Sequence, residues 1–240
     1  MLQNTKSRIA LITGATRGIG KAISILLAKN KIHVIILGRT LSALDDLSDK
    51  INDIGGSSTC IQFDLNDLSE ISKISQEIKR RWGKLDILIS NAAYLHNLTP
   101  LYHIREKDWQ ISLNTNLSSN WLLIKHFENL LLESKYGRAI FMTSGASQGY
   151  RPFWGAYAIT KAGLDSMVRA WSSEMDKTNL SINLYDPGPT KTQMRASAYP
   201  GEDPKILKDP DEIAKDILKI CNKNFIKNGE RLEFNKVLIN

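Results

Sequence analysis

The stretch TGATRGIG, residues 13–20, decides the fold predicted for this chain. It follows a strand-like apolar run and opens an amphipathic helical pattern. In that setting Gly14 permits a tight turn, Gly18 lets the backbone approach a pyrophosphate, and Gly20 lets the helix pack closely on the strand. Free N–H groups at the start of the helix attract the anion. The stretch therefore predicts a dinucleotide-binding unit, with a purely structural turn as the alternative.

Short apolar runs alternate with longer amphipathic ones along the rest of the chain. The runs expected to form strands are Arg8–Thr13, His33–Gly38, Thr59–Asp64, Leu85–Ser90, Arg138–Thr143 and Ser181–Asp186, with a weaker one at Arg231–Phe234. The helical patterns cover Ile19–Asn30, Leu41–Ile54, Leu68–Trp82, Asp108–Glu133, Gly155–Lys177 and Asp211–Asn222. Nearly continuous apolar strands separated by helices predict a doubly wound, Rossmann-like α/β fold with a parallel sheet covered on both faces.

Composition limits the organisation and the location of the protein. The 240 residues show no compositional break, so we expect a single domain over 1–240. No apolar run approaches the roughly 20 residues that span a bilayer, and the polar N-terminus does not read as a signal peptide. We therefore expect a cytoplasmic protein without membrane contact.

Charge and cysteine usage narrow the possible partners. The net charge is +7, but Lys and Arg are spread along helix faces without a basic arm. An anionic cofactor explains this charge better than a nucleic acid does. Cys60 and Cys221 show no metal-ligand spacing, so neither a metal site nor a disulfide is expected.

The segment 191–210 interrupts the alternation of strands and helices. Pro200, Gly201, Pro204 and Pro210 prevent a long helix or strand there. We interpret this segment as a loop that covers the substrate. A plain surface connection is the alternative, although its length would be unusual.

The residues after the second expected strand bear on the choice of cofactor. An acidic residue at this point would bind the ribose 2′-hydroxyl of NAD, but the chain has Gly38, Arg39 and Thr40. The guanidinium groups of Arg17 and Arg39 could instead clasp a 2′-phosphate through charge-assisted hydrogen bonds. The sequence thus predicts NADP(H) as the cofactor. Alternatively, Arg39 only ends the strand in solvent.

A second motif carries candidate chemistry. Tyr157 and Lys161 stand four residues apart in a helical pattern, so their side chains share one face. A nearby ammonium would favour the phenolate and lower the pKa of the tyrosine, which would suit acid–base catalysis. Ser144 follows the fifth expected strand, at the sheet edge where ligands bind in open α/β sheets. Taken singly, these residues are more often an ordinary surface pair and a turn serine.

The order of these motifs resembles that of the short-chain dehydrogenase/reductase family over nearly the whole chain. The matching positions are the TGATRGIG turn, Asp64-Leu65, Ser90-Asn91-Ala92-Ala93, Asn116, Ser144, Tyr157 with Lys161, Pro187-Gly188-Pro189-Thr190 and Thr192. The resemblance implies that Tyr157 exchanges a proton with the substrate oxygen and that Ser144 steadies that oxygen. It also implies that Lys161 holds the nicotinamide ribose and that Asn116 holds a water linking Lys161 to solvent.

The resemblance also implies a set of cofactor contacts. These are Gly14, Thr16, Arg17, Gly18, Ile19, Gly20, Arg39, Thr40, Asp64, Leu65, Asn91, Ala92, Ala93, Tyr157, Lys161, Pro187, Gly188, Thr190 and Thr192. The chain departs from the family pattern at Ser90 and Ala93, which replace the usual Asn and Gly. It also has Asn228-Gly229-Glu230-Arg231-Leu232 in place of the usual Asp-Gly-Gly ending. Residues 192–204 resemble a little-characterised bacterial subgroup of oxidoreductases.

The expected substrate pocket is aromatic. Its proposed lining includes Ser144, Tyr150, Trp154 and Met194, which would suit an apolar or ring-bearing carbonyl compound or alcohol. Core or subunit contacts are the alternative for these aromatic residues. Two other functions stay open: reduction of 3-oxoacyl chains on an acidic carrier protein, and NADP(H) sensing without catalysis. By analogy with the family, a homodimer or homotetramer is expected.

Overall fold

The computed structural model describes residues 7–149 and 151–237, and a seven-stranded parallel sheet forms its centre. The strands are β1 (Ile9–Thr13), β2 (His33–Gly38), β3 (Ser58–Gln62), β4 (Ile87–Ser90), β5 (Gly137–Met142), β6 (Leu180–Asp186) and β7 (Arg231–Glu233). Their order across the sheet is β3-β2-β1-β4-β5-β6-β7. The predicted Rossmann-like α/β class is confirmed, and the weak signal near residue 231 does form an edge strand parallel to β6.

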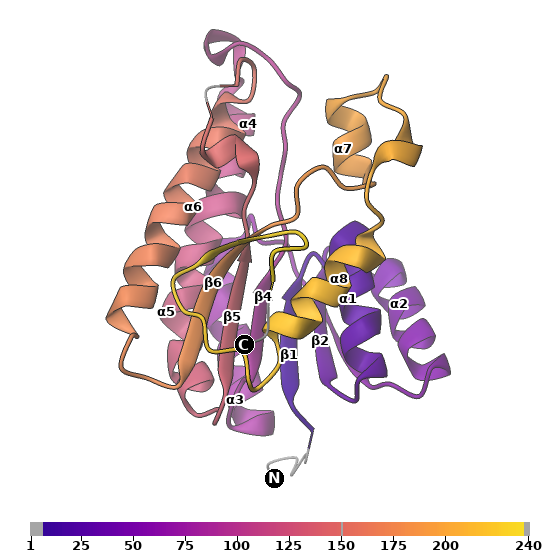
Figure 1. Cartoon of the computed structure of the whole chain (residues 1–240), viewed down its shortest axis with the longest axis vertical. Coiled ribbons are helices and arrows are strands. Elements are labelled where there is room, and N and C mark those ends of the chain that lie inside the picture. The colour runs from indigo at the N-terminus through magenta and orange to yellow at the C-terminus, as the bar shows by residue number, and fades with distance from the viewer. Residues whose placement is uncertain (1–6, 150, 238–240) are drawn as a thin grey trace.

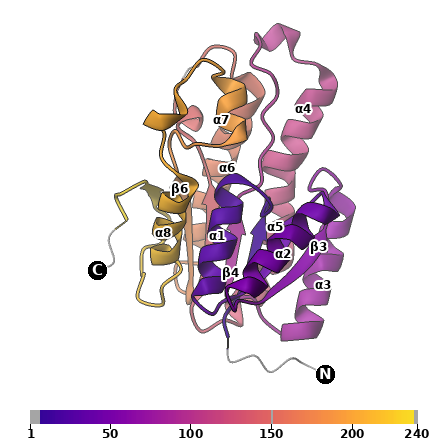
Figure 2. The same ribbon diagram turned by 90° about the vertical axis from the view of Figure 1, so that its right-hand side faces the viewer.

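Helices cover both faces of this sheet (Figure 1). They are α1 (Gly18–Lys29), α2 (Leu41–Asp53), α3 (Ile71–Trp82), α4 (Glu106–Leu113), α5 (Ser119–Leu132), α6 (Gly155–Glu174), α7 (Gln193–Ala198) and α8 (Pro210–Ile220). Helices α1, α2 and α8 pack on one face, and α3, α5 and α6 pack on the other. Figure 2 views the molecule from the side of α1 and α2, which lie in front of the sheet. None of the helices within the described ranges is long and apolar enough to cross a membrane.

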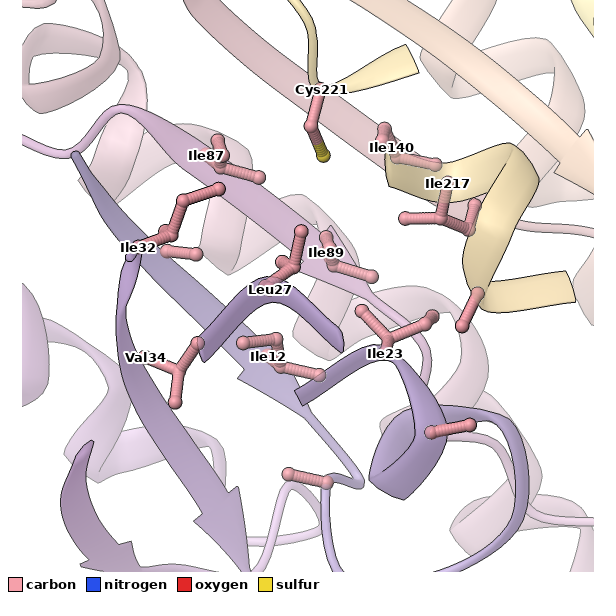
Figure 3. Packing of buried hydrophobic residues seen from close by; sticks show 14 of the residues in the cluster. Ile12, Ile23, Leu27, Ile32, Val34, Ile87, Ile89, Ile140, Ile217 and Cys221 are labelled. Atoms are coloured by element: carbon pink, nitrogen blue, oxygen red, sulfur yellow. The ribbon is translucent and has the colours of Figure 1, made fainter. Parts of the chain in front are cut away.

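Alternating residues of each strand supply the two cores, because successive side chains of a strand point to opposite faces. In β1, Ile12 joins the layer beneath α1 and α8, whereas Leu11 joins the opposite layer. Figure 3 shows Ile12 of β1 near Ile23 and Leu27 of α1, with Ile217 of α8 entering the same layer. These four side chains and that of Leu11 are almost completely buried. Burial on both faces explains why the strands read as continuous apolar runs.

Several element boundaries differ from the sequence prediction, and two of these differences have a clear local cause. The helix expected over Asp108–Glu133 is interrupted by a π-helical turn, Asn114–Ser118, between α4 and α5. The turn inserts backbone at a point where Asn116 bonds to another segment, and a continuous apolar pattern does not reveal it. Helix α8 begins at Pro210 rather than Asp211, because Asp209 caps it in a capping box with Glu212.

The sheet order places the functional residues. The order reverses between β1 and β4, since the chain first builds outward through β2 and β3 and then returns to the other side of β1. Ligands of open α/β sheets bind outside the carboxyl ends of the strands at such a switch point. The glycine turn follows β1 and Asn91 follows β4, so both lie there.

Leu27→Ala in α1 should lower the free energy of unfolding by about 3 kcal/mol, because it leaves a cavity where a fully enclosed side chain packs. Leu41→Ala is the matched control, since Leu41 is 51% exposed whereas Leu27 is 1% exposed. Urea unfolding followed by circular dichroism measures both changes. Equal destabilisation by the two substitutions would contradict this packing.

Candidate functional site

The glycine turn is held in a shape that only small residues allow. Gly14 has a φ of +62°, and a Cβ there would lie 2.9 Å from the Cα of Ala92. A Cβ at Gly20 would lie 2.2 Å from the carbonyl oxygen of Gly14, so α1 approaches the end of β1 directly through backbone. The turn leaves the first N–H groups of α1 without a side-chain cap, because Arg17 at the N-cap makes no capping bond. This geometry suits a phosphate group.

Asn91 braces this turn from the neighbouring strand. Its Nδ2 donates to the carbonyl oxygens of Thr13 at 3.0 Å and Gly14 at 3.1 Å. The Thr13 hydroxyl in turn accepts from the backbone N–H groups of Asn91 and Ala92, both at 3.0 Å. Asn91 therefore fixes the shape of the glycine turn. A direct contact of Asn91, Ala92 or Ala93 with a cofactor stays a prediction.

The residues expected at the adenine end lie at the carboxyl ends of β2 and β3. Arg39 and Thr40 are exposed after β2, and Asp64 is exposed after β3 with Leu65 buried beside it. A guanidinium nitrogen of Arg39 lies 4.0 Å from a carboxylate oxygen of Asp64. Such an exposed pair is weak, so Arg39 is available to an anion.

Arg17 lies in the glycine turn, directly before α1. Its Nη1 donates to Oε1 of Gln193 at 2.9 Å, which joins the glycine turn to α7. Thr192 caps α7 by accepting from the N–H of Arg195 at 3.2 Å, and its methyl carbon would lie 3.2 Å from a Cβ at Gly18. The segment 191–210 is thus fastened over the start of α1.

Helix α6 brings Tyr157 and Lys161 together as the four-residue spacing predicts. The Lys161 Nζ lies 5.8 Å from the centre of the Tyr157 ring and donates to the carbonyl oxygen of Met142 at 2.7 Å. Ser144 lies close enough to Tyr157 to oppose the rise in its pKa, and its Oγ accepts from the N–H of Ala146 at 3.2 Å. Ser144, Tyr157 and Lys161 therefore form one cluster at the ends of β5 and α6.

Burial controls the ionisation of this cluster. It raises the pKa of Tyr157 to about 12, which Ser144 opposes and Asp186 reinforces. The net shift is therefore opposite to the lowered pKa that the sequence predicted, because desolvation is the largest cause. Burial also lowers the pKa of Lys161 to about 8, against the attraction of Asp165 and Asp186. Tyr157 is held as a protonated phenol, ready to donate.

Asn116 lies in the π-helical turn and is completely buried. Its Oδ1 accepts from the N–H of Tyr94 at 2.7 Å, and its Nδ2 donates to the carbonyl oxygen of Tyr94 at 2.9 Å and to Oγ1 of Thr160 at 3.1 Å. The side chain thus ties the loop after β4 to α6, one residue before Lys161. A water relay through Asn116 stays a prediction.

The loop after β6 contains the remaining expected cofactor residues. Its start is fixed by Asp186, whose Oδ1 accepts from the N–H of Gly188 at 2.9 Å. Thr190 donates to the carbonyl oxygen of Gly188 at 3.1 Å. The Nζ of Lys208 reaches the carbonyl oxygen of Pro187 at 2.6 Å. Sequence reasoning missed Lys208, since nothing in its neighbourhood along the chain marks a contact with residue 187.

Aromatic residues adjoin the hydroxyl of the cluster. The Trp154 ring lies 5.7 Å from the Tyr157 ring and 6.0 Å from the Tyr199 ring, measured between centroids. The guanidinium of Arg195 stacks 3.8 Å above Tyr199 and pairs with Glu202. The Trp154 ring therefore adjoins both Tyr157 and Tyr199 of the segment 191–210, and a contact of Trp154 with a substrate stays a prediction.

The structure does not place two of the expected substrate residues, Met194 and Tyr150, beside Tyr157. Met194 lies half-buried on α7, and its contact with a substrate stays a prediction. Tyr150 lies outside the described residues. No cluster of metal-ligating side chains occurs in the parts of the chain that the structure covers.

Other proteins are similar to this chain in sequence and in fold. A family model described as short chain dehydrogenase matches residues 8–203. The uncharacterized oxidoreductase YciK of Escherichia coli (strain K12) is 33% identical over 211 residues, which cover 86% of this chain and 82% of that protein. A 3-oxoacyl-[acyl-carrier-protein] reductase of Synechocystis sp. (strain ATCC 27184 / PCC 6803 / Kazusa) is 29% identical over 189 residues, covering 78% of this chain and 76% of that protein.

Solved structures agree with this result. A crystal structure from Escherichia coli CFT073, a short chain dehydrogenase complexed with NADPH, has a TM-score of 0.91 at 30% identity and covers 98% of each chain. A parallel sheet with a glycine turn at its switch point and a Ser-Tyr-Lys cluster defines a dinucleotide-fold oxidoreductase. The chain belongs to the short-chain dehydrogenase/reductase family.

Gly20→Ala should destabilise the protein by about 1–3 kcal/mol, because the added methyl group would press on the Gly14 carbonyl in a packed region. Gly201→Ala is the matched control, since a Cβ there would have no neighbour within 4 Å. Thermal unfolding of both variants measures the difference. A Gly20→Ala protein that is as stable as Gly201→Ala would refute the close contact between α1 and β1.

Proposed function

We propose that this oxidoreductase uses NADP(H) to interconvert a carbonyl compound and its alcohol, with Tyr157 as the general acid and base. The observation that carries the proposal is the buried Tyr157 phenol. It lies near Ser144, which opposes the rise in its pKa, and beside Lys161, at the carboxyl edge of the sheet. A proton donor placed at a ligand-binding edge is what carbonyl reduction requires.

The residues present fit a dinucleotide. Gly14 and Gly18 form a tight turn with positive φ before α1, whose N-cap makes no side-chain hydrogen bond, so N–H groups at the start of α1 are available to a pyrophosphate. Arg39, exposed at the end of β2, and Arg17 provide guanidinium groups for a 2′-phosphate. The NADPH in the Escherichia coli CFT073 relative supports the same choice here. When bound, the cofactor supplies or accepts a hydride.

Residues of the protein donate and accept the proton. In reduction, Tyr157 donates its proton to the substrate oxygen while the carbonyl carbon gains a hydride, so that the product is a neutral alcohol. Ser144 steadies that oxygen through its hydroxyl. The positive charge of Lys161 stabilises the phenolate left on Tyr157, which then regains a proton from solvent. In oxidation the same groups work in reverse, with the phenolate as the base.

The aromatic walls indicate the kind of substrate. Trp154 lies between Tyr157 and Tyr199, so the approach to the phenol passes flat apolar rings. Segment 191–210, with Met194 on α7, would cover a substrate bound there. An apolar or ring-bearing carbonyl compound suits this lining, because apolar and aromatic surface dominates ligand pockets. A panel of such carbonyls assayed by NADPH oxidation tests this choice.

A 3-oxoacyl chain on a carrier protein is the second candidate substrate. The Synechocystis relative is named for that reaction, and the net charge of +7 would favour an acidic carrier. Turnover that requires the carrier rather than a free thioester would identify it. A purely sensing role is disfavoured because Ser144, Tyr157 and Lys161 are all present and adjoin one another.

A homodimer or homotetramer accords with the surface. Trp109 of α4, Trp121 of α5 and Ile159 of α6 are 36%, 52% and 46% exposed. Large apolar side chains gathered on neighbouring helices are typical of subunit contacts. A molar mass from light scattering establishes the number of subunits.

Tyr157→Phe should reduce turnover at least about a thousandfold while NADPH binding stays within about threefold, because only the transferable proton is removed. The measurements are NADPH oxidation with the most active carbonyl and fluorescence titration with NADPH. Loss of cofactor binding along with turnover would contradict the assigned role.

Arg39→Ala should weaken NADPH binding by about tenfold or more and leave NADH binding unchanged, because only NADPH has the 2′-phosphate. Fluorescence titrations of parent and variant give the four dissociation constants. Arg80→Ala on α3 is the control, since this exposed arginine pairs with Glu77 away from the expected cofactor residues. Equal affinity of the parent for NADPH and NADH would refute the assigned preference.

A further inference from the structure

A buried arginine from the edge strand reaches the interior beside the catalytic cluster. The guanidinium of Arg231 on β7 pairs with Asp165 at 2.6 Å through Nη1 and with Asp186 at 2.7 Å through Nη2. The three side chains are only 8%, 8% and 14% exposed, in that order. Arg231 lies in the C-terminal stretch that departs from the family's usual ending.

The same guanidinium touches the turn that carries Ser144. Its Nη1 donates to Oγ1 of Thr143 at 3.3 Å and to Oγ of Ser147 at 3.1 Å. Both hydroxyls also donate to Asp165, and the Ser147 bond is 2.7 Å long. Thr143 precedes Ser144 and Ser147 ends the short helical turn that follows it, so the network holds Ser144 from both sides.

The two aspartates connect the network to the other parts of the site. Asp165 lies one helical turn after Lys161 on α6, where residues four apart share a face. Asp186 ends β6, and its Oδ1 fixes the N–H of Gly188. One arginine thereby joins the Ser144 turn, the helix that carries Tyr157 and Lys161, and the start of the loop after β6.

The two aspartates also affect the ionisation of Lys161 and Tyr157. Asp165 and Asp186 both raise the pKa of Lys161 against the larger lowering by burial, and Asp186 also raises the pKa of Tyr157. Buried charges act over longer distances than exposed ones, because solvent screens them less. The guanidinium of Arg231 pairs with both carboxylates and compensates part of their negative charge.

Other charged groups approach this region from neighbouring elements. Lys208, from the segment before α8, faces Asp186. The guanidinium of Arg151 and the carboxylate of Asp186 would both lie within 4 Å of a Cβ at Gly145. On the far side of α6, Asp108 of α4 is engaged by Arg105 and Tyr94, and interacts with His96.

We propose that Arg231 is a positioning residue for the proton-exchange cluster: it holds the Ser144 turn and the loop after β6 against α6, and it partly neutralises Asp165 and Asp186. Its catalytic consequence rests on the proposed function. Its electrostatic consequence does not, because the ionisation of Lys161 can be measured without turnover.

The sign of the effect distinguishes this role from a structural one. Removing the Arg231 charge leaves two carboxylates near Lys161, so the pKa of Lys161 should rise. Removing the Asp186 charge should lower the pKa of Lys161 instead. A clamp that only supported the fold would not produce shifts of opposite sign at one lysine.

The test is an NMR titration of the full-length protein with lysines isotopically labelled at Cε, in which Lys161→Arg assigns the signal. Arg231→Met should raise the midpoint of Lys161 by about one pH unit, and Asp186→Asn should lower it by a similar amount. The double variant should return close to the parent. Arg80→Met, which removes an exposed arginine on α3, should not move the midpoint.

Two further measurements separate geometry from charge. Arg231→Lys keeps the charge but not the forked contacts, so the Lys161 midpoint should stay near that of the parent while kcat falls severalfold. With an active carbonyl, the pH profile of kcat for alcohol oxidation should move upward in Arg231→Met, because the phenolate of Tyr157 forms at higher pH.

The outcomes are distinct from those that test the proposed function. A parent protein that turns over no carbonyl but shows opposite shifts at Lys161 would refute the function and keep the electrostatic role of Arg231. A Lys161 midpoint that is unmoved in both folded variants would overturn the role of Arg231. If Arg231→Met does not fold, Asp186→Asn decides, and an unchanged or raised midpoint in that variant overturns it.

Discussion

The direct contact of α1 with the end of β1 is the constraint on which the site depends. Gly20 meets the Gly14 carbonyl without an intervening side chain, and Asn91 of the neighbouring strand end ties the turn down. This contact aims the start of α1 across the switch point of the sheet. Because all seven strands are parallel, the ends of β1, β4, β5 and β6 then meet at one edge. For that reason, the residues expected to bind phosphate lie near those proposed to exchange a proton.

Burial gives the second half of the site its chemical character. Tyr157 and Lys161 are 6% and 2% exposed, and desolvation moves the pKa of each toward its neutral form. The phenol is therefore kept as an acid, and the lysine lies close to the point where it changes charge. Asp165 and Asp186 lie near this pair, and Arg231 compensates part of their negative charge. An oxidoreductase that exchanges one proton in each turnover benefits from groups adjusted in this way.

Sequence reasoning recovered the parts of the protein that are encoded locally. The TGATRGIG turn, the strand pattern and the Tyr157–Lys161 spacing each lie within a few residues, so periodicity and glycine placement were enough to predict them. The π-helical turn at Asn116 was not predicted, because an apolar pattern continues through it. The direction of the pKa of Tyr157 was predicted wrongly, since burial depends on the whole fold. The Arg231 network joins residues up to 88 positions apart and has no local signal.

The central claim is that the chain passes hydride from NADPH to a carbonyl carbon beside Tyr157. The most direct test supplies NADPH deuterated at the transferable position of its nicotinamide ring, together with a panel of apolar and ring-bearing carbonyl compounds. Mass spectrometry then locates the label in the products. The account predicts an alcohol that bears one deuterium on the carbinol carbon. Tight NADPH binding without a deuterated alcohol from any member of the panel, the 3-oxoacyl carrier substrate included, would contradict it.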